Sequence, residues 1–218
     1  MSIDFNHARE TMVEQQIRPW DVLEPRVLEV LSTLPREAFV PEIHRALAYA
    51  DLEIPLGHGA RMMKPVVEGR MLQALDLQPG EEVLEIGTGS GFISACLSAL
   101  AREVVSLEIV PELAAAAQAR LQAQGLAQRV RVETADALQY QTTRRFDAIC
   151  VTGAVTEVPA HFRQWLRPGG RLFAVRGRSP VMEAVLLHEA VNGPRVESLF
   201  ETDLAYLAGA APAPQFEF

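Results

Sequence analysis

The chain has 218 residues, of which 49% are hydrophobic, so it can bury a sizeable core as one large domain or as a domain with an extension. Its 20 Lys and Arg residues are outnumbered by 28 Asp and Glu residues, and the net charge of −8 argues against a nucleic-acid partner, which requires a basic surface. No segment approaches the length of about 18 apolar residues that a membrane span needs. The first residues also lack the basic and then apolar pattern of a secretory signal. We therefore expect a cytoplasmic protein with no membrane contact.

Residues 7–80 show helical patterns interrupted by prolines and glycines. Asn6 is a suitable N-cap for a first helix over residues 7–17. Apolar residues at helical spacing predict a second helix around residues 23–31. A proline suited to the first helical turn predicts a third over residues 65–75. The chain between the second and third helices is expected to be irregular.

From residue 82 onward, strand and helix patterns alternate, which predicts a Rossmann-like, doubly wound and mostly parallel α/β sheet covered on both faces. The expected strands cover residues 82–86, 103–108, 128–133, 146–151 and 170–176, and the expected helices cover residues 90–101, 111–123 and 159–166. Two closing strands over residues 181–188 and 195–202 should be antiparallel. The Ala- and Pro-rich tail at 208–214 should be irregular.

The segment from Val83 to Phe92, V-L-E-I-G-T-G-S-G-F, predicts a buried strand, a tight glycine turn and the start of a helix. Dinucleotide enzymes favour G-x-G-x-x-G, with a pyrophosphate at the helix N-terminus. Here the spacing is G-x-G-x-G, and Glu85 precedes it. A carboxylate at this place would repel a pyrophosphate but suits an ammonium or a sulfonium, and S-adenosylmethionine carries both. The alternative is a tight turn that binds no ligand.

Ligands bind at the carboxyl ends of the strands in such sheets, so the residues just past each strand are candidates. Glu108 ends the second strand and can hold ribose hydroxyls. Asp136 follows the third strand and can accept from an adenine amino group, while the backbone N–H of Ala137 can donate to a ring nitrogen. The alternative for Asp136 is a turn or a helix cap. The small residues 152–154 leave an opening for a substrate.

Other reactive side chains are scattered. His58 lies on a glycine-flanked loop that should cover the site, either as a general base or as an exposed loop histidine. Arg61 and Lys64 can bind a substrate carboxylate or can be solvated charges. Cys96 and Cys150 fall in apolar patterns and are expected to be buried free thiols. The five histidines have no metal-ligand spacing, so we expect no metal site.

Several segments in this order resemble one known family. The segments P-R-E-A-F-V-P at 35–41, A-Y-A-D at 48–51 and I-P-L-G at 54–57 resemble the N-terminal signature of the protein-L-isoaspartate O-methyltransferases. The glycine loop matches that family's cofactor loop, with Phe92 where tyrosine is usual. Residues 146–149 and 166–170 resemble later motifs of the family. The similarity covers roughly residues 10–177.

The resemblance implies a class I methyltransferase fold with helical N-terminal additions. It divides the chain into an extension and active-site cover at 1–80 and an S-adenosylmethionine-binding domain at 81–218. It also implies methyl transfer from S-adenosylmethionine to the free carboxylate of isoaspartyl residues in damaged proteins. The cofactor-binding residues expected from the motifs and the resemblance together are Glu85, Gly87, Thr88, Gly89, Gly91, Glu108, Asp136 and Ala137.

The chain also departs from the family pattern. Residues 61–65 read R-M-M-K-P where the family has a Thr-Ile-Ser-like triplet, so Met63 stands at the position of the active-site serine and offers no hydroxyl. The family's proline late in the fifth strand is missing at 174–177, and its closing Phe-Val-Pro pattern is absent near 199–200. Catalytic residues are not assigned; His58, Arg61, Met63 and Lys64 are the candidates around the substrate. A methyltransferase for another acceptor and a non-catalytic S-adenosylmethionine binder stay open as alternatives.

Overall fold

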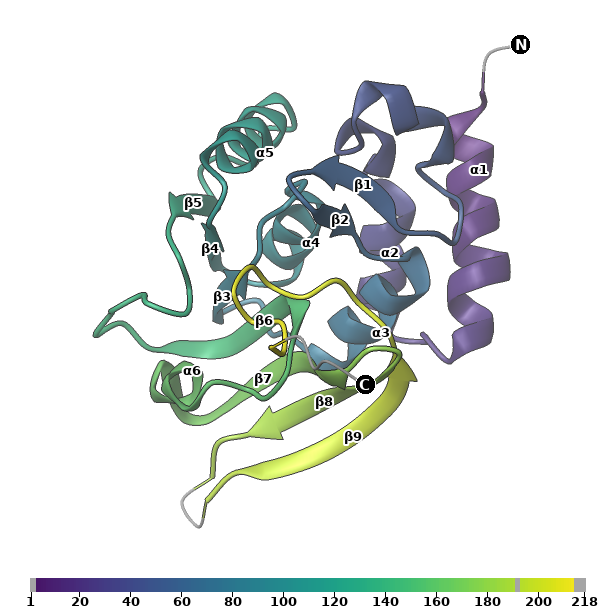
Figure 1. Cartoon of the computed structure of the whole chain (residues 1–218). Coiled ribbons are helices and arrows are strands. Elements are labelled where there is room, and N and C mark those ends of the chain that lie inside the picture. The colour runs from purple at the N-terminus through teal and green to yellow at the C-terminus, as the bar shows by residue number, and fades with distance from the viewer. Residues whose placement is uncertain (1–2, 191–192, 214–218) are drawn as a thin grey trace, which may run out of the picture.

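A computed structural model describes residues 3–190 and 193–213 of the chain. Seven strands form one sheet in the order β5-β4-β3-β6-β7-β8-β9 (Figure 1). They are β3 (Glu82–Ile86), β4 (Glu103–Glu108), β5 (Val130–Thr134), β6 (Phe146–Val155), β7 (Leu166–Arg178), β8 (Val181–His188) and β9 (Arg195–Thr202). Strands β3 to β7 pair in parallel, and β8 and β9 add antiparallel. The predicted Rossmann-like sheet and its two closing strands are confirmed.

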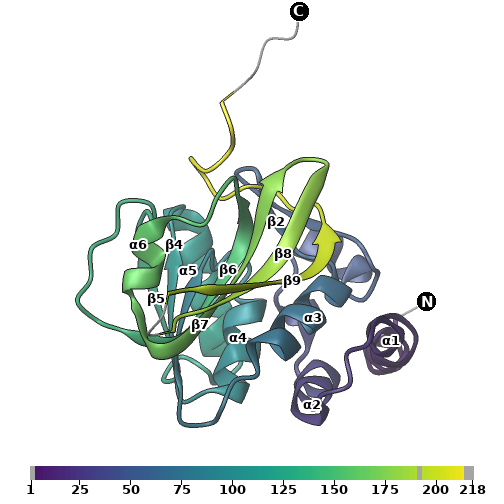
Figure 2. The same ribbon diagram turned by 90° about the horizontal axis from the view of Figure 1, so that it is seen from below.

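Helices cover both faces of this sheet because alternate residues of each buried strand point to opposite sides. On one face, Val83 of β3 packs in a cluster with residues of α3 (Pro65–Leu75) and α4 (Phe92–Leu100). Leu121, near the end of α5 (Pro111–Ala123), belongs to the same cluster. Leu84 and its neighbours pack on the other face with α6 (Ala160–Gln164). Figure 2 shows α6 on one side of the sheet and α3 and α4 on the other.

The N-terminal helices differ from the prediction in their details. The first helix, α1 (Phe5–Met12), is capped by Asp4 rather than Asn6, because the Asp4 carboxylate accepts from the backbone N–H groups of Asn6 and His7, each at 3.1 Å. A π-helical turn (Val13–Ile17) and a 3₁₀ turn (Arg18–Trp20) extend it. The second helix, α2 (Pro25–Thr33), lies in the expected region, and two 3₁₀ turns (Arg36–Ala38 and Glu42–Leu47) follow.

Part of the region predicted to be irregular is a hairpin. Strands β1 (Ile54–Gly57) and β2 (Ala60–Met62) pair antiparallel. Gly57, His58 and Gly59 have φ values of 88°, 52° and 79°, and this left-handed backbone closes the turn. The hairpin was missed because each strand is too short to show an alternating pattern.

Several predicted boundaries shift. The helix predicted over 90–101 begins at Phe92, because Gly91 has a left-handed φ of 87° at its N-cap. The strand predicted over 146–151 continues to Val155, and that over 170–176 begins at Leu166. The helix predicted over 159–166 is therefore shorter, Ala160–Gln164. The strand predicted over 128–133 is Val130–Thr134.

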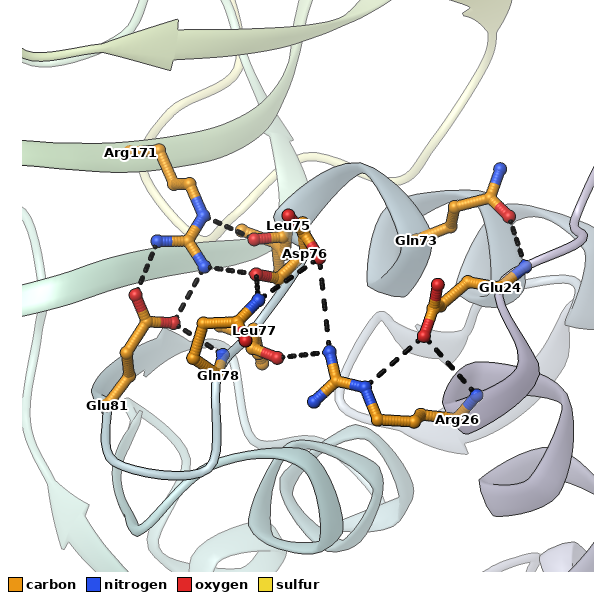
Figure 3. Close-up of polar contacts among 9 residues, drawn as sticks. All are labelled: Glu24, Arg26, Gln73, Leu75, Asp76, Leu77, Gln78, Glu81 and Arg171. Carbon is orange, nitrogen blue, oxygen red and sulfur yellow. Dashed lines mark hydrogen bonds and ion pairs between the residues drawn. The ribbon is translucent and has the colours of Figure 1, made fainter.

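A polar cluster fastens the N-terminal helices to the sheet (Figure 3). Gln73 of α3 accepts from the backbone N–H of Glu24, just before α2, at 2.9 Å. Arg26 of α2 pairs with the Glu24 side chain at 3.2 Å. Arg171 of β7 donates to both carboxylate oxygens of Glu81 at 2.9 and 2.7 Å and also to the carbonyl of the last residue of α3. The end of α3 is thus held against the start of the sheet.

One hydrophobic cluster runs from Met12 through α3 to Leu186, so the N-terminal helices and the sheet share a core. The division of the chain at residue 80 stays a prediction. Cys96 and Cys150 are buried and free, as expected. Among residues 3–190 and 193–213, no helix is long and apolar enough to cross a membrane, and no group of three His, Cys, Asp or Glu side chains is placed to hold a metal ion.

Candidate active site

A cavity of about 270 Å³ lies at the carboxyl ends of the parallel strands. This is the edge where open α/β sheets bind their ligands. Several parts of the chain form its walls: residues 53, 58–61 and 63 around the β1–β2 hairpin, 86, 87 and 89 at the end of β3, 107–110 at the end of β4, 135–138 after β5, 152–153 in β6 and 204–208 after β9. Figure 1 shows the hairpin and the segment after β9 beside the tip of β3.

The glycine loop forms the floor of the cavity. Gly87 and Gly89 line it with φ values of 98° and 53°. The backbone N–H of Gly87 donates to the carbonyl of Leu107 at 2.8 Å, which ties the loop to β4. A Cβ on Gly87 would lie 2.5 Å from the hydroxyl of Thr152, and one on Gly89 would lie 3.2 Å from Leu56. Both positions therefore favour glycine for conformation, and Gly87 also requires it for space.

Glu108 ends β4 and lines the cavity while being only 6% exposed. One carboxylate oxygen accepts from the backbone N–H of Gly89 at 2.7 Å, and the other accepts from that of Val110 at 3.1 Å. These two bonds fix the orientation of the carboxylate. An ionised carboxylate has about four acceptor positions, so each oxygen can accept a further bond from a ligand hydroxyl.

Asp136 and Ala137 line the cavity after β5. One Asp136 oxygen accepts from the backbone N–H of Leu138 at 2.9 Å, so this residue stabilises a local turn and faces the cavity as well. The carbonyl of Ala137 contacts Nε2 of His161 at 3.1 Å. His161 belongs to an aromatic cluster with Phe162 and Trp165. The turn is thus supported from the sheet face covered by α6.

Glu85 and Thr88 do not line the cavity, contrary to the direct contact expected from the sequence. Glu85 is fully buried beneath the loop, because it shares the strand face of Val83 and points towards α4. One oxygen accepts from Ser94 and from Ser106, the latter at 2.5 Å. Its other oxygen, Oε1, has no hydrogen-bond partner in the part of the chain that the structure describes. Burial raises the pKa of Glu85 to about 8, although the bonds from Ser106 and Ser94 oppose this effect. The Thr88 hydroxyl joins the same network, 2.6 Å from Ser106.

Two further predicted residues lie outside the cavity. Gly91 is the N-cap of α4 and packs on α5, where an added Cβ would lie 3.2 Å from that of Ala117. Lys64 is the exposed residue before α3, and its carbonyl accepts from the first turn of that helix. Gly91 thus shapes the loop before α4, and Lys64 precedes the first turn of α3.

Three of the substrate candidates, His58, Arg61 and Met63, do line the cavity. His58 lies at the exposed turn of the hairpin. Arg61 of β2 is half-exposed and faces Glu53, with 3.8 Å between guanidinium nitrogen and carboxylate oxygen. Among the described residues that line the cavity, Arg61 is the only Lys or Arg. Sequence reasoning missed Glu53 and the wall formed by 204–208, because neither follows a parallel strand.

The sequence model of the family described as Protein-L-isoaspartate(D-aspartate) O-methyltransferase (PCMT) matches residues 7–191. The chain belongs to this family.

Relatives of known name support this assignment over most of the chain. Protein-L-isoaspartate O-methyltransferase 2 of Marinobacter nauticus is 38% identical over 205 residues, which cover 94% of this chain and 93% of the relative. Protein-L-isoaspartate O-methyltransferase of Myxococcus xanthus is 40% identical over 192 residues, which cover 86% of this chain and 91% of the relative.

Solved structures show the same fold at lower identity. A putative protein-L-isoaspartate O-methyltransferase from Plasmodium falciparum, in complex with S-adenosyl-L-homocysteine, superposes with a TM-score of 0.79 at 18% identity and covers 94% of this chain and 99% of that one. A second protein-L-isoaspartate O-methyltransferase gives a TM-score of 0.80 at 22% identity, covering 93% of this chain and 66% of that one. The match to the protein-L-isoaspartate O-methyltransferase family model ends at residue 191, before the wall at 204–208.

Proposed function

We propose that this chain is a protein-L-isoaspartate O-methyltransferase that uses S-adenosylmethionine to methylate the free carboxylate of isoaspartyl residues in proteins. The observation that carries the proposal is a single cavity in which a tight glycine loop and two carboxylates from successive strand ends meet: Gly87, Gly89, Glu108 and Asp136. Membership of the family supplies the acceptor class.

The residues at this end of the cavity fit S-adenosylmethionine. Gly87 and Gly89 line the cavity without side chains, so ligand atoms can approach their backbone. Glu108 would hold the ribose hydroxyls with its remaining acceptor positions, and Asp136 would accept from the adenine amino group. Glu85 would act from beneath the loop on the charge of the bound cofactor rather than by contact.

The hairpin end of the cavity would receive the acceptor. Arg61 is half-exposed there, and its ion pair to Glu53 is long at 3.8 Å, so its guanidinium can turn to a substrate carboxylate. Met63 packs beside it as a buried apolar wall. In this chain a charged pair therefore replaces the hydroxyl that the family's serine would offer.

For methyl transfer, the protein has mainly to position the acceptor carboxylate beside the methyl group. S-adenosylmethionine, when bound, supplies an electrophilic methyl group. A carboxylate acceptor is already ionised at neutral pH, so no residue has to remove a proton from it. The role of Arg61 would be to orient the acceptor, and the apolar walls, Met63 among them, would exclude water.

The test is transfer of a labelled methyl group from S-adenosylmethionine to an isoaspartyl peptide, beside the same peptide with a normal aspartyl residue. We expect methylation of the isoaspartyl peptide alone. Turnover of neither peptide, with cofactor binding intact by calorimetry, would contradict the proposed acceptor and favour another acceptor or a non-catalytic binder. A cytoplasmic location and the lack of a nucleic-acid partner stay predictions from the sequence.

A further inference from the structure

The segment after β9, residues 203–210, which we call the strap, forms one wall of the cavity. Leu204, Tyr206 and Leu207 are among the residues that line it. In Figure 1 the strap leaves the end of β9 and passes the tips of β3 and β6 below the β1–β2 hairpin. The strap contains no helix or strand of its own, so its position depends on what it is attached to.

Backbone contacts join the strap to β6 at one residue. The N–H of Ala154 donates to the carbonyl of Ala205 at 2.9 Å, and the N–H of Leu207 donates to the carbonyl of Ala154 at 2.9 Å. This isolated bridge brings the Leu207 side chain against two glycines. A Cβ on Gly153 would lie 2.8 Å from Leu207 Cδ2, and one on Gly87 would lie 3.4 Å from the same atom. Leu207 thus closes the space beside the glycine loop.

The Tyr206 hydroxyl provides the second attachment. It donates to the carbonyl of Gly177 at 3.1 Å and accepts from the backbone N–H of Ser179 at 3.1 Å. Both partners lie where β7 turns into β8. The hydroxyl of Ser179 donates in turn to Asp203 at the start of the strap, at 3.0 Å. One phenol group therefore bridges the strap to the turn between β7 and β8.

We propose that Tyr206 is a positioning residue: by clamping the strap to the β7–β8 turn, it holds Leu207 on Gly87 and Gly153 and keeps the cofactor end of the cavity closed. The inference rests on the proposed function, since it assigns the cavity to S-adenosylmethionine. Without the clamp, the strap keeps its bridge at Ala154 but samples open positions. The apparent affinity for a ligand falls in proportion to the closed fraction.

The first variant is Tyr206→Phe, which keeps the ring and removes only the hydroxyl. We expect calorimetry to show S-adenosylhomocysteine binding weakened about 3- to 30-fold, as the loss of two ordinary hydrogen bonds allows. The melting temperature should stay within about 2 °C of wild type, because the Leu207 wall and not the sheet is loosened. Tyr49→Phe is the matched control: it also loses a hydroxyl bond, to Glu37, away from the strap, and should bind within about twofold of wild type.

The second variant separates the clamp from general loosening of the fold. Leu207→Ala should weaken binding by itself, and Tyr206→Phe in that background should weaken it no further, because the clamp acts through Leu207. Additive losses, unchanged binding by Tyr206→Phe, or a Tyr206→Phe protein that does not fold would each overturn the inference. Wild-type protein that fails to bind S-adenosylhomocysteine would overturn the proposed function itself, which the other outcomes leave standing.

Discussion

At the scale of single residues, two acids at the same edge of the sheet have opposite surroundings. Glu108 lines the cavity, and two backbone N–H groups donate to its carboxylate and fix its orientation. Glu85 lies fully buried beneath the glycine loop, where burial raises its pKa to about 8. The same residue type therefore lines the cavity at one position and is enclosed beneath it at the other.

Glu108→Ala should weaken binding of S-adenosylhomocysteine strongly. A hydrogen bond to a charged group contributes about 1.5–3 kcal/mol, so the loss of the ribose contacts should cost roughly ten- to a hundredfold in affinity by calorimetry. Glu112→Ala is the control, because it removes the same charge from an exposed position in the first turn of α5. Equal affinities in the two variants would remove Glu108 from the ribose role.

At the scale of elements, the site depends on a buried guanidinium that fastens the cover to the core. Arg36 is fully buried and donates to both oxygens of Glu68 in α3, at 3.0 and 2.9 Å. It also donates to the carbonyl of Met63, which lines the cavity, at 2.8 Å and to that of Ala48 at 2.7 Å. Its guanidinium lies over the ring of Phe92 at the start of α4. Five pieces of chain are thus joined at one side chain.

Arg36→Met should destabilise the protein by about 3–5 kcal/mol, because it leaves the Glu68 carboxylate buried without its partner. Arg18→Ala, which breaks the exposed pair with Glu14, should cost under about 1 kcal/mol. Denaturant unfolding of both variants measures the difference. If Arg36→Met unfolds at the wild-type denaturant concentration, the cover is held by apolar packing alone.

The same elements explain how far the sequence could lead. Strands β3 and β4, helix α5 and the two closing strands were predicted to the residue, because strong hydrophobic runs end at acids, prolines or glycines. The β1–β2 hairpin was missed because it is set by its turn and by packing rather than by periodicity. Glu85 was assigned to the cavity because a motif gives its position in the chain but not how deeply the following loop buries it. The strap gives no pattern at all, since tertiary contacts alone place it.

At the scale of the whole molecule, stability should depend on pH in an unusual direction. A buried acid with a raised pKa binds its proton more tightly in the folded than in the unfolded chain. The contribution of Glu85 to the free energy of unfolding is therefore greatest when the pH is below the ordinary glutamate pKa. This contribution is lost as the pH rises towards about 8. Glu68 is buried as well, and burial raises its pKa against the attraction of Arg36. The pKa values of Glu81, Glu82 and Glu183 are lowered instead, so the stability that these residues contribute is lost as the pH falls into the acidic range.

Glu85→Gln should flatten the decline of stability between about pH 5 and pH 8, because the amide is neutral throughout. At about 1.4 kcal/mol for each unit of pKa shift, the wild type should lose up to roughly 4 kcal/mol more than the variant across this window. Denaturant unfolding at four pH values in the window measures both slopes. Parallel slopes would mean that Glu85 stays ionised in the fold, held so by Ser94 and Ser106.

Because the strap follows every strand of the sheet in the sequence, it is synthesised after the other walls of the cavity. By the time residue 202 has left the ribosome, every strand of the sheet and the glycine loop are available to fold. The wall at 204–208 comes later, and Tyr206 can reach Gly177 only then. A nascent or prematurely terminated chain that stops at residue 202 would therefore have the complete sheet but an open, incomplete pocket. Emergence of residues 203–210 is what would make the molecule competent to hold its cofactor.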